Sequence, residues 1–204
     1  MSAPTQLEKL MTMARRQAML RERDIRENGI SSTTISRAVA KGNLIRLSPG
    51  LYHHPDAVLD EHFSLSEVAA RVPQAVIVLV SALQFHQIGT HQAHSIWLLI
   101  RNNAVAPRID YPPLEVVKSG IEKAFTKGVE THLLNDIQVR ITNPARTVID
   151  CFKYRNRVGL ELCLEALKDV LSSSRHRVTP DQLMDYAKPL RVATVIHPYL
   201  EAVV

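Results

Sequence analysis

Three side chains in the first quarter of the chain have the chemistry and the spacing of residues that contact nucleic acid from one face of a helix. Thr33, Arg37 and Lys41 follow one another at intervals of four residues, which places them on one side of a helix. A guanidinium can make a bidentate contact to guanine, and a threonine can contact a base or a thymine methyl group. Thr34 lies beside this row, three residues before Arg37. The pattern predicts contacts to DNA bases.

Thr33, Arg37 and Lys41 share one face only if this segment is a helix. The sequence predicts such a helix over residues 33–41. Ser31 and Ser32 are candidate N-caps, because a serine side chain can accept a hydrogen bond from the first helical turn. Gly42-Asn43 ends the helix. The side opposite the polar row is apolar and holds Ile35, Ala38 and Val39.

Two earlier helices are expected to support this one. Apolar residues at steps of three and four predict a helix over residues 6–20, with Thr5 and Glu8 at the spacing of a capping box. A second, short helix is expected over residues 21–27, ended by Asn28-Gly29. A helix, a tight turn with glycine and another helix form the signature of a helix-turn-helix.

A predicted β-hairpin follows the third helix. Two short apolar segments, residues 44–47 and 51–53, flank the turn sequence Ser48-Pro49-Gly50. A hairpin directly after a reading helix is a wing, and Arg46 and Ser48 would lie near its tip, within reach of phosphate or the minor groove. The candidate DNA-binding residues are therefore Ser32, Thr33, Thr34, Ser36, Arg37, Lys41, Arg46 and Ser48.

The net charge of +5 is concentrated in this same part of the chain. Residues 1–54 hold nine Lys or Arg against four acids, whereas the remaining residues hold 16 of each sign. A localised basic excess attracts polyanions and is the expected electrostatic footprint of nucleic-acid binding. A solvated basic face without a ligand would show the same excess.

The rest of the chain predicts a second domain of mixed α/β structure. A buried strand is expected over residues 75–80, and further strands over 95–100, 114–118 and 138–142. Helices are expected over residues 63–71, 81–88, 144–152 and 159–171, then from Thr179, and over 192–204. We therefore expect an α+β fold with a winged helix-turn-helix domain at 1–58 and a larger mixed α/β domain at 59–204.

No catalytic or metal-binding motif emerges from this second domain. His86, His91 and His94 lie close in sequence but lack a nearby carboxylate or cysteine that would complete a metal shell. Cys151 and Cys163 are expected to be buried thiols. Arg146 and Asp150 are at the spacing of an ion pair within one helix. We expect no enzymatic activity, no metal and no cofactor.

The sequence gives no sign of export or membrane insertion. The first residues lack the apolar region of a signal peptide, and the longest apolar run, residues 75–80, is far too short to cross a bilayer. We expect a cytoplasmic protein with no membrane partner.

Three segments make the chain similar to a known family. They are IRLSPGLY at 45–52, SALQFHQI at 81–88 followed by SIWL at 95–98, and ITNPARTVID at 141–150. Together and in this order they resemble the AbiEi-type antitoxins of type IV toxin–antitoxin systems. One extra residue separates Arg46 from Gly50 in comparison with the usual pattern of the family.

The resemblance implies an autorepressor and antitoxin. It implies that the winged helix binds double-stranded DNA at inverted repeats of its own promoter, with two copies per operator. It also implies that the C-terminal domain opposes a nucleotidyltransferase toxin from a partner gene without requiring a stable complex.

Three alternatives remain open at this stage. The winged helix could contact protein instead of DNA, the chain could be an ordinary transcription factor without a toxin, or the second domain could act on nucleic acid as an enzyme. The last alternative would require a cluster of carboxylates or histidines in a pocket.

Overall fold

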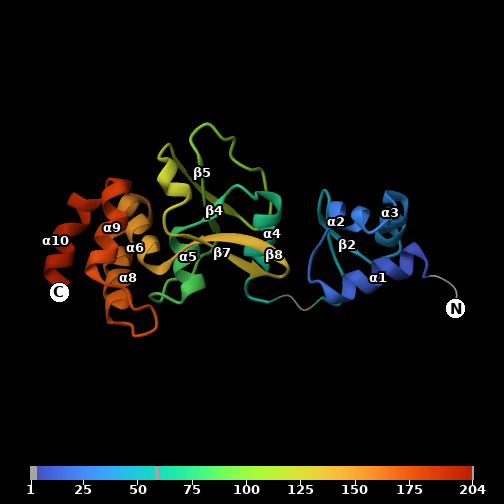
Figure 1. Cartoon of the computed structure of the whole chain (residues 1–204), viewed down its shortest axis with the longest axis horizontal. Coiled ribbons are helices and arrows are strands. Elements are labelled where there is room, and N and C mark those ends of the chain that lie inside the picture. The colour runs from blue at the N-terminus through green and yellow to red at the C-terminus, as the bar shows by residue number, and fades with distance from the viewer. Residues whose placement is uncertain (1–3, 58–59, 204) are drawn as a thin grey trace. The chain divides into compact units, whose positions relative to one another are not determined.

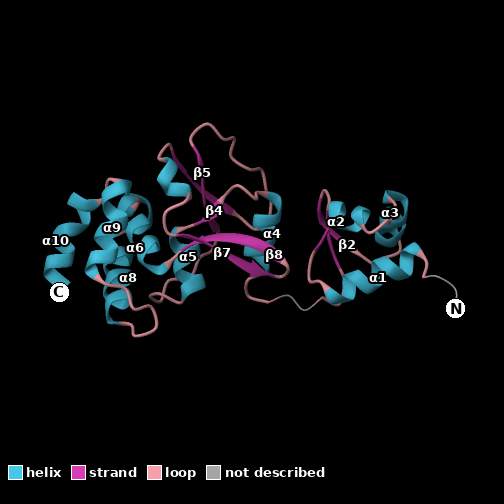
Figure 2. Ribbon diagram, viewed as in Figure 1, coloured by secondary structure: helices cyan, strands magenta, loops and turns pink. Residues whose placement is uncertain are grey.

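A computed structural model describes residues 4–57 and 60–203, and it divides the chain into two compact units. One comprises residues 1–73 and the hairpin tip 133–138, and the other comprises 74–132 and 139–204. Helices and two separate sheets make up the structure, which confirms the mixed α+β class (Figures 1 and 2). The domain boundary predicted between residues 58 and 59 lies outside the described residues.

Three helices and a three-stranded antiparallel sheet form the first part of the chain. The helices are α1 (Gln6–Arg16), α2 (Glu22–Glu27) and α3 (Ser32–Ala40). The strands are β1 (Leu20–Arg21), β2 (Ile45–Ser48) and β3 (Leu51–His53), in the order β1-β3-β2. Their shared core is apolar and contains Leu10, Ala14, Leu20, Ile25, Ile30, Ile35, Ala38, Leu44 and Tyr52.

Local capping explains where α1 and α3 begin. Thr5 and Glu8 form the reciprocal capping box expected from their spacing, and the Ser31 side chain accepts a hydrogen bond from the Thr34 N–H. Helix α1 ends at Arg16, four residues earlier than predicted. After three irregular residues the chain forms β1, where Leu20 pairs with Tyr52 of β3.

A five-stranded sheet organises the second part of the chain. Its order is β6-β5-β4-β8-β7, built from β4 (Val76–Ile77), β5 (Ile96–Arg101), β6 (Leu114–Ser119), β7 (Val129–Leu134) and β8 (Ile137–Thr142). Strand β4 pairs antiparallel with β5 and parallel with β8, while β5 and β6 are parallel. The sheet is therefore mixed, with β6 and β7 at its edges.

The remaining helices run from Phe63 to the C-terminus of the described chain, and the first of them belongs to the first unit. They are α4 (Phe63–Arg71), α5 (Leu79–His86), the 3-10 helix η1 (Glu122–Phe125), α6 (Pro144–Lys153), α7 (Arg155–Val158), α8 (Leu160–Ser172), α9 (Pro180–Leu190) and α10 (Ala193–Val203). Helix α6 is buried from Ala145 to Phe152 and packs against α5, α8 and α9. Among the described residues, no helix has both the length and the apolar character needed to span a bilayer.

The apolar segment at 75–80 is the clearest error of the sequence prediction. Only Val76 and Ile77 are a strand, and α5 already begins at Leu79. All six residues are buried, so an unbroken apolar run did not distinguish a strand from a buried helix. Strand β7, helix α7 and η1 were not predicted.

Candidate nucleic-acid interface

Helix α3 separates an apolar side from a polar side. Ile35 and Ala38 are buried in the core, and the other side of the helix faces solvent. Five of the eight proposed DNA-binding residues are exposed on or directly after this helix: Ser32, Thr33, Ser36, Arg37 and Lys41. The polar row predicted from the sequence is thus accessible, as contact with a ligand requires.

Thr34 differs from these five because its hydroxyl is already engaged. It donates a hydrogen bond to Oε1 of Gln6 over 2.9 Å, so Ser31 Oγ, 3.0 Å from Thr34 Oγ1, must be the donor in their contact. The same Gln6 oxygen accepts the backbone N–H of Ser31 over 3.1 Å. Thr34 is half-buried, and it is held in the framework at the start of α3.

The β2–β3 hairpin places the last two proposed residues differently. Arg46 is exposed, whereas Ser48 is only 8% exposed. The register between the strands shifts between Arg46 and Ser48, and Ser48 lies on the inner side of the hairpin. Ser48 is therefore the one proposed residue that the structure places away from solvent.

Helix α2 anchors this hairpin from the side. The Glu22 N–H donates to the carbonyl of Gly50 over 2.8 Å, and the Tyr52 hydroxyl donates to Glu22 Oε2 over 3.2 Å. Burial and the neighbouring Glu22 carboxylate raise the pKa of Tyr52, so this phenol keeps its proton at neutral pH. These bonds fix the hairpin to the helices that carry the candidate interface.

The basic side chains of this unit are not equally available to a polyanion. On α2, Arg23 lies 3.5 Å from Asp24 and 3.6 Å from Glu27. In contrast, within the described ranges no carboxylate lies at ion-pair distance from Arg37, Lys41 or Arg46. The unneutralised positive charge on α3 and β2 is therefore free to attract phosphate.

The histidines of the second unit do not form a metal site in the part of the chain that the structure describes. His86 is mostly buried and donates from Nε2 to the carbonyl of Thr142 over 2.7 Å. His91 lies 3.0 Å from Glu165, a carboxylate that sequence proximity could not reveal. Burial lowers the pKa of His86 to about 4. Each of these two rings thus has a separate structural partner.

The remaining polar groups singled out in the sequence are structural as well. Arg146 and Asp150 form the predicted ion pair, with 3.1 Å between Nε and Oδ1 and both side chains almost fully buried. Arg146 also donates to the carbonyls of Lys127 and Ala124. Cys151 and Cys163 are buried free thiols, as expected.

The first part of the chain is similar to a known protein family. Residues 8–52 match the family model described as "Transcriptional regulator, AbiEi antitoxin", which confirms the resemblance for this segment. The matched segment contains all eight proposed DNA-binding residues. No curated protein matches the chain.

Solved structures are also similar to the chain, and one of them matches over most of it. It is the crystal structure of RV2827C protein from Mycobacterium tuberculosis, with a TM-score of 0.62 and 14% sequence identity. The match covers 92% of this chain and 72% of the other. At this identity the likeness concerns the fold alone.

Proposed function

We propose that α1, α2, α3 and the β2–β3 hairpin form a winged helix-turn-helix that binds double-stranded DNA, and that the protein is an AbiEi-type transcriptional regulator and antitoxin. One observation carries the proposal. Arg37, Lys41 and Arg46 are exposed and have no carboxylate at ion-pair distance within the described chain, and they lie on the third helix and the hairpin, in the segment that matches the regulator family. These are the two elements with which winged helices contact DNA.

The proposed contacts divide into two kinds. In the major groove, the N-terminal part of α3 presents Ser32, Thr33 and Ser36 to base edges, and Arg37 makes a bidentate contact to guanine. Lys41 and Arg46 contact phosphate and orient the protein without reading sequence. Thr34 positions the helix through Gln6, and Ser48 supports the hairpin from inside.

The regulator would act on its own operon. Inverted repeats upstream of the gene would bind two copies, one on each half-site, and block transcription. The second proposed activity is opposition to a nucleotidyltransferase toxin encoded by a neighbouring gene, with no stable complex required. The match of residues 8–52 to an antitoxin family supports this activity, and co-expression of the two genes in a growth assay would test it.

A reporter assay in cells tests autoregulation. The DNA upstream of the gene drives a reporter, and the full chain is supplied from a second promoter. We expect repression by the native protein and its loss with Arg37→Ala. Arg23→Ala, a matched change at an ion-paired arginine on α2, should keep it. Equal repression by both variants would exclude α3 as the reading helix, and absence of repression by the native protein would favour a protein-contact role.

A further inference from the structure

The two edge strands of the five-stranded sheet differ in whether side chains bond to their outward-facing backbone groups. At the β6 edge, two backbone carbonyls are capped by side chains from α7 and the residue before it. Arg157 donates to the carbonyl of Val116 over 2.8 Å, and the Tyr154 hydroxyl donates to that of Lys118 over 3.2 Å. Such capping occupies two acceptors that another strand would need in order to pair with β6.

Among the described residues, no side chain caps the centre of strand β7, which lies at the other edge. The turn between β7 and β8 has two residues, Asn135 and Asp136, both with positive φ, which is typical of a type I′ hairpin. This turn directs the backbone groups of even-numbered β7 residues toward β8. The Asn143 N–H donates to the carbonyl of Gly128 over 2.9 Å, which agrees with this register at the far end.

The odd-numbered residues of β7 therefore direct their N–H and C=O groups away from the sheet. Within the described part of the chain, the backbone groups of Thr131 and Leu133 have no hydrogen-bond partner on this outer side. Leu133 is also 70% exposed, and it is one of six large apolar residues that are exposed in the described structure. An uncapped edge with an exposed leucine can template the pairing of another strand.

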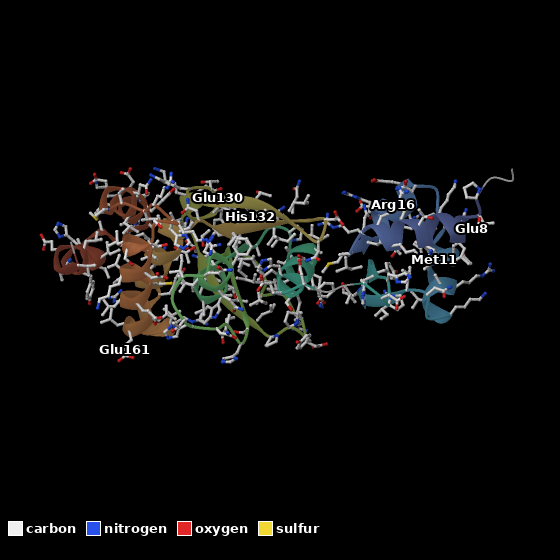
Figure 3. All side chains as sticks on the ribbon, turned by 90° about the horizontal axis from the view of Figure 1, so that it is seen from below. Glu8, Met11, Arg16, Glu130, His132 and Glu161 are labelled. Atoms are coloured by element: carbon white, nitrogen blue, oxygen red, sulfur yellow. The ribbon has the colours of Figure 1, made fainter. Side chains whose placement is uncertain are left out.

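We propose that β7 pairs antiparallel with β7 of a second copy of this chain, around a two-fold axis at Thr131. In this register the outward-directed residues face one another: Thr131 faces Thr131 of the second copy, and Leu133 faces Val129. The remaining pair brings Glu130 opposite His132. Each His132, whose Nε2 already lies 3.6 Å from Glu130 Oε2 of its own strand, would thus face a second carboxylate and not a like charge, which would be destabilising. Both side chains belong to β7 (Figure 3).

Self-complementarity is the reason to assign a second copy to this edge. In an antiparallel pair of identical strands, residues at equal distances on either side of the centre face one another, so these residues must be compatible. Residues 129–133 meet this condition, because they pair apolar with apolar, acid with imidazole and threonine with threonine. A two-fold pair is also a closed arrangement that leaves no further β7 edge open. The contact is one strand wide, so we expect weak, concentration-dependent association. The inference does not depend on DNA binding.

Sedimentation velocity of the full chain without DNA, over a range of protein concentrations, tests the proposal. We expect the native protein to shift from monomer to dimer as its concentration rises. Thr131→Pro removes the outward N–H at the axis, and proline is tolerated where an edge-strand N–H faces solvent. This variant should stay monomeric. Thr131→Val keeps the N–H and should dimerise like the native protein.

Thermal unfolding would reveal whether the proline variant is misfolded. A second variant keeps the proposal testable in that case. Glu130→Lys changes a half-exposed side chain and places a lysine opposite His132 of the second copy. We expect it to weaken association by at least about tenfold. A native protein that remains monomeric at every concentration would overturn the proposal. So would dimerisation that survives both Thr131→Pro and Glu130→Lys, or that is lost in Thr131→Val.

Discussion

The side-chain oxygen of Gln6 lies 2.9 Å from the hydroxyl of Thr34, although 27 residues separate the two in the sequence. The same oxygen accepts the backbone N–H of Ser31. One amide group thus ties the first turn of α1, the helix that also carries Glu8, Met11 and Arg16 (Figure 3), to the first turn of α3. The start of the proposed reading helix is therefore fixed by a helix that need not touch DNA bases.

Replacement of Gln6 by leucine should loosen this junction. Gln6→Leu keeps the approximate size but removes the acceptor for two hydrogen bonds, each contributing about 0.5–1.5 kcal/mol. We expect a lower free energy of unfolding and weaker discrimination between operator and scrambled DNA. Because Thr34→Val removes the partner of the same bond, the double variant should lose less than the sum of the single variants. Urea unfolding and DNA titration measure both effects.

Gln17→Leu is the control, since Gln17 is an exposed glutamine at the other end of α1. It should change neither stability nor discrimination appreciably. Strict additivity of Gln6→Leu and Thr34→Val would contradict the assigned coupling between the two side chains.

The buried ion pair of α6 should be a strong determinant of stability. Arg146→Met removes the cation beside Asp150 and leaves a buried carboxylate without its partner, a change that typically costs about 3–5 kcal/mol. It also removes donors to two backbone carbonyls. Chemical unfolding followed by circular dichroism would measure the loss. The double variant Arg146→Met, Asp150→Leu should recover part of it.

The matched control for this experiment is Arg23→Met on α2. Arg23 also pairs with an acid four residues away, but its side chain is 75% exposed. Exposed pairs contribute about 0–1 kcal/mol, so this variant should be nearly neutral. A similar loss of stability in both variants would show that burial does not set the strength of the Arg146–Asp150 pair.

His86 should make the protein less stable in acid. Its pKa is lowered from 6.5 to about 4, first by burial and then by the charges of His132, His176 and Arg175. Between these two pH values the unfolded chain binds a proton that the folded chain does not, so stability decreases as the pH falls below 6.5. The full difference corresponds to about 3 kcal/mol, reached below pH 4.

Denaturant titrations at several pH values between 7 and 4 would measure this slope. His86→Gln keeps a donor for the carbonyl of Thr142 but does not titrate, so its stability should depend less on pH in this window. His94→Gln, at an exposed histidine, should retain the native pH dependence. The assignment to His86 would fail if the His86→Gln variant kept the full native slope.

Local signals explain most of what the sequence could predict. The N-caps Thr5, Ser31, Asn143 and Thr179 each accept a hydrogen bond from a residue three positions later, so they could be recognised from short spacing alone. The same holds for the Arg146–Asp150 pair, whose members lie one helical turn apart. The basic polar side of α3 was predicted because helical periodicity fixes which residues share a face.

Features that depend on distant parts of the chain could not be predicted in this way. Strand β7 carries polar and apolar residues without a clean alternation, and its place at the sheet edge follows from pairing with β8. Glu165 reaches His91 from a position 74 residues away. The burial of Ser48 accompanies a register shift in the pairing of β2 with β3, which the turn sequence alone does not specify.

Titration of the native protein with the DNA just upstream of its own gene, against scrambled DNA of the same composition and at two salt concentrations, tests the central claim most directly. We predict tighter binding to the upstream DNA, with an affinity that falls as salt rises because phosphate contacts release counterions. Equal and weak binding to both DNAs at both salt concentrations would contradict the assignment of α3 and the hairpin as a DNA-reading surface.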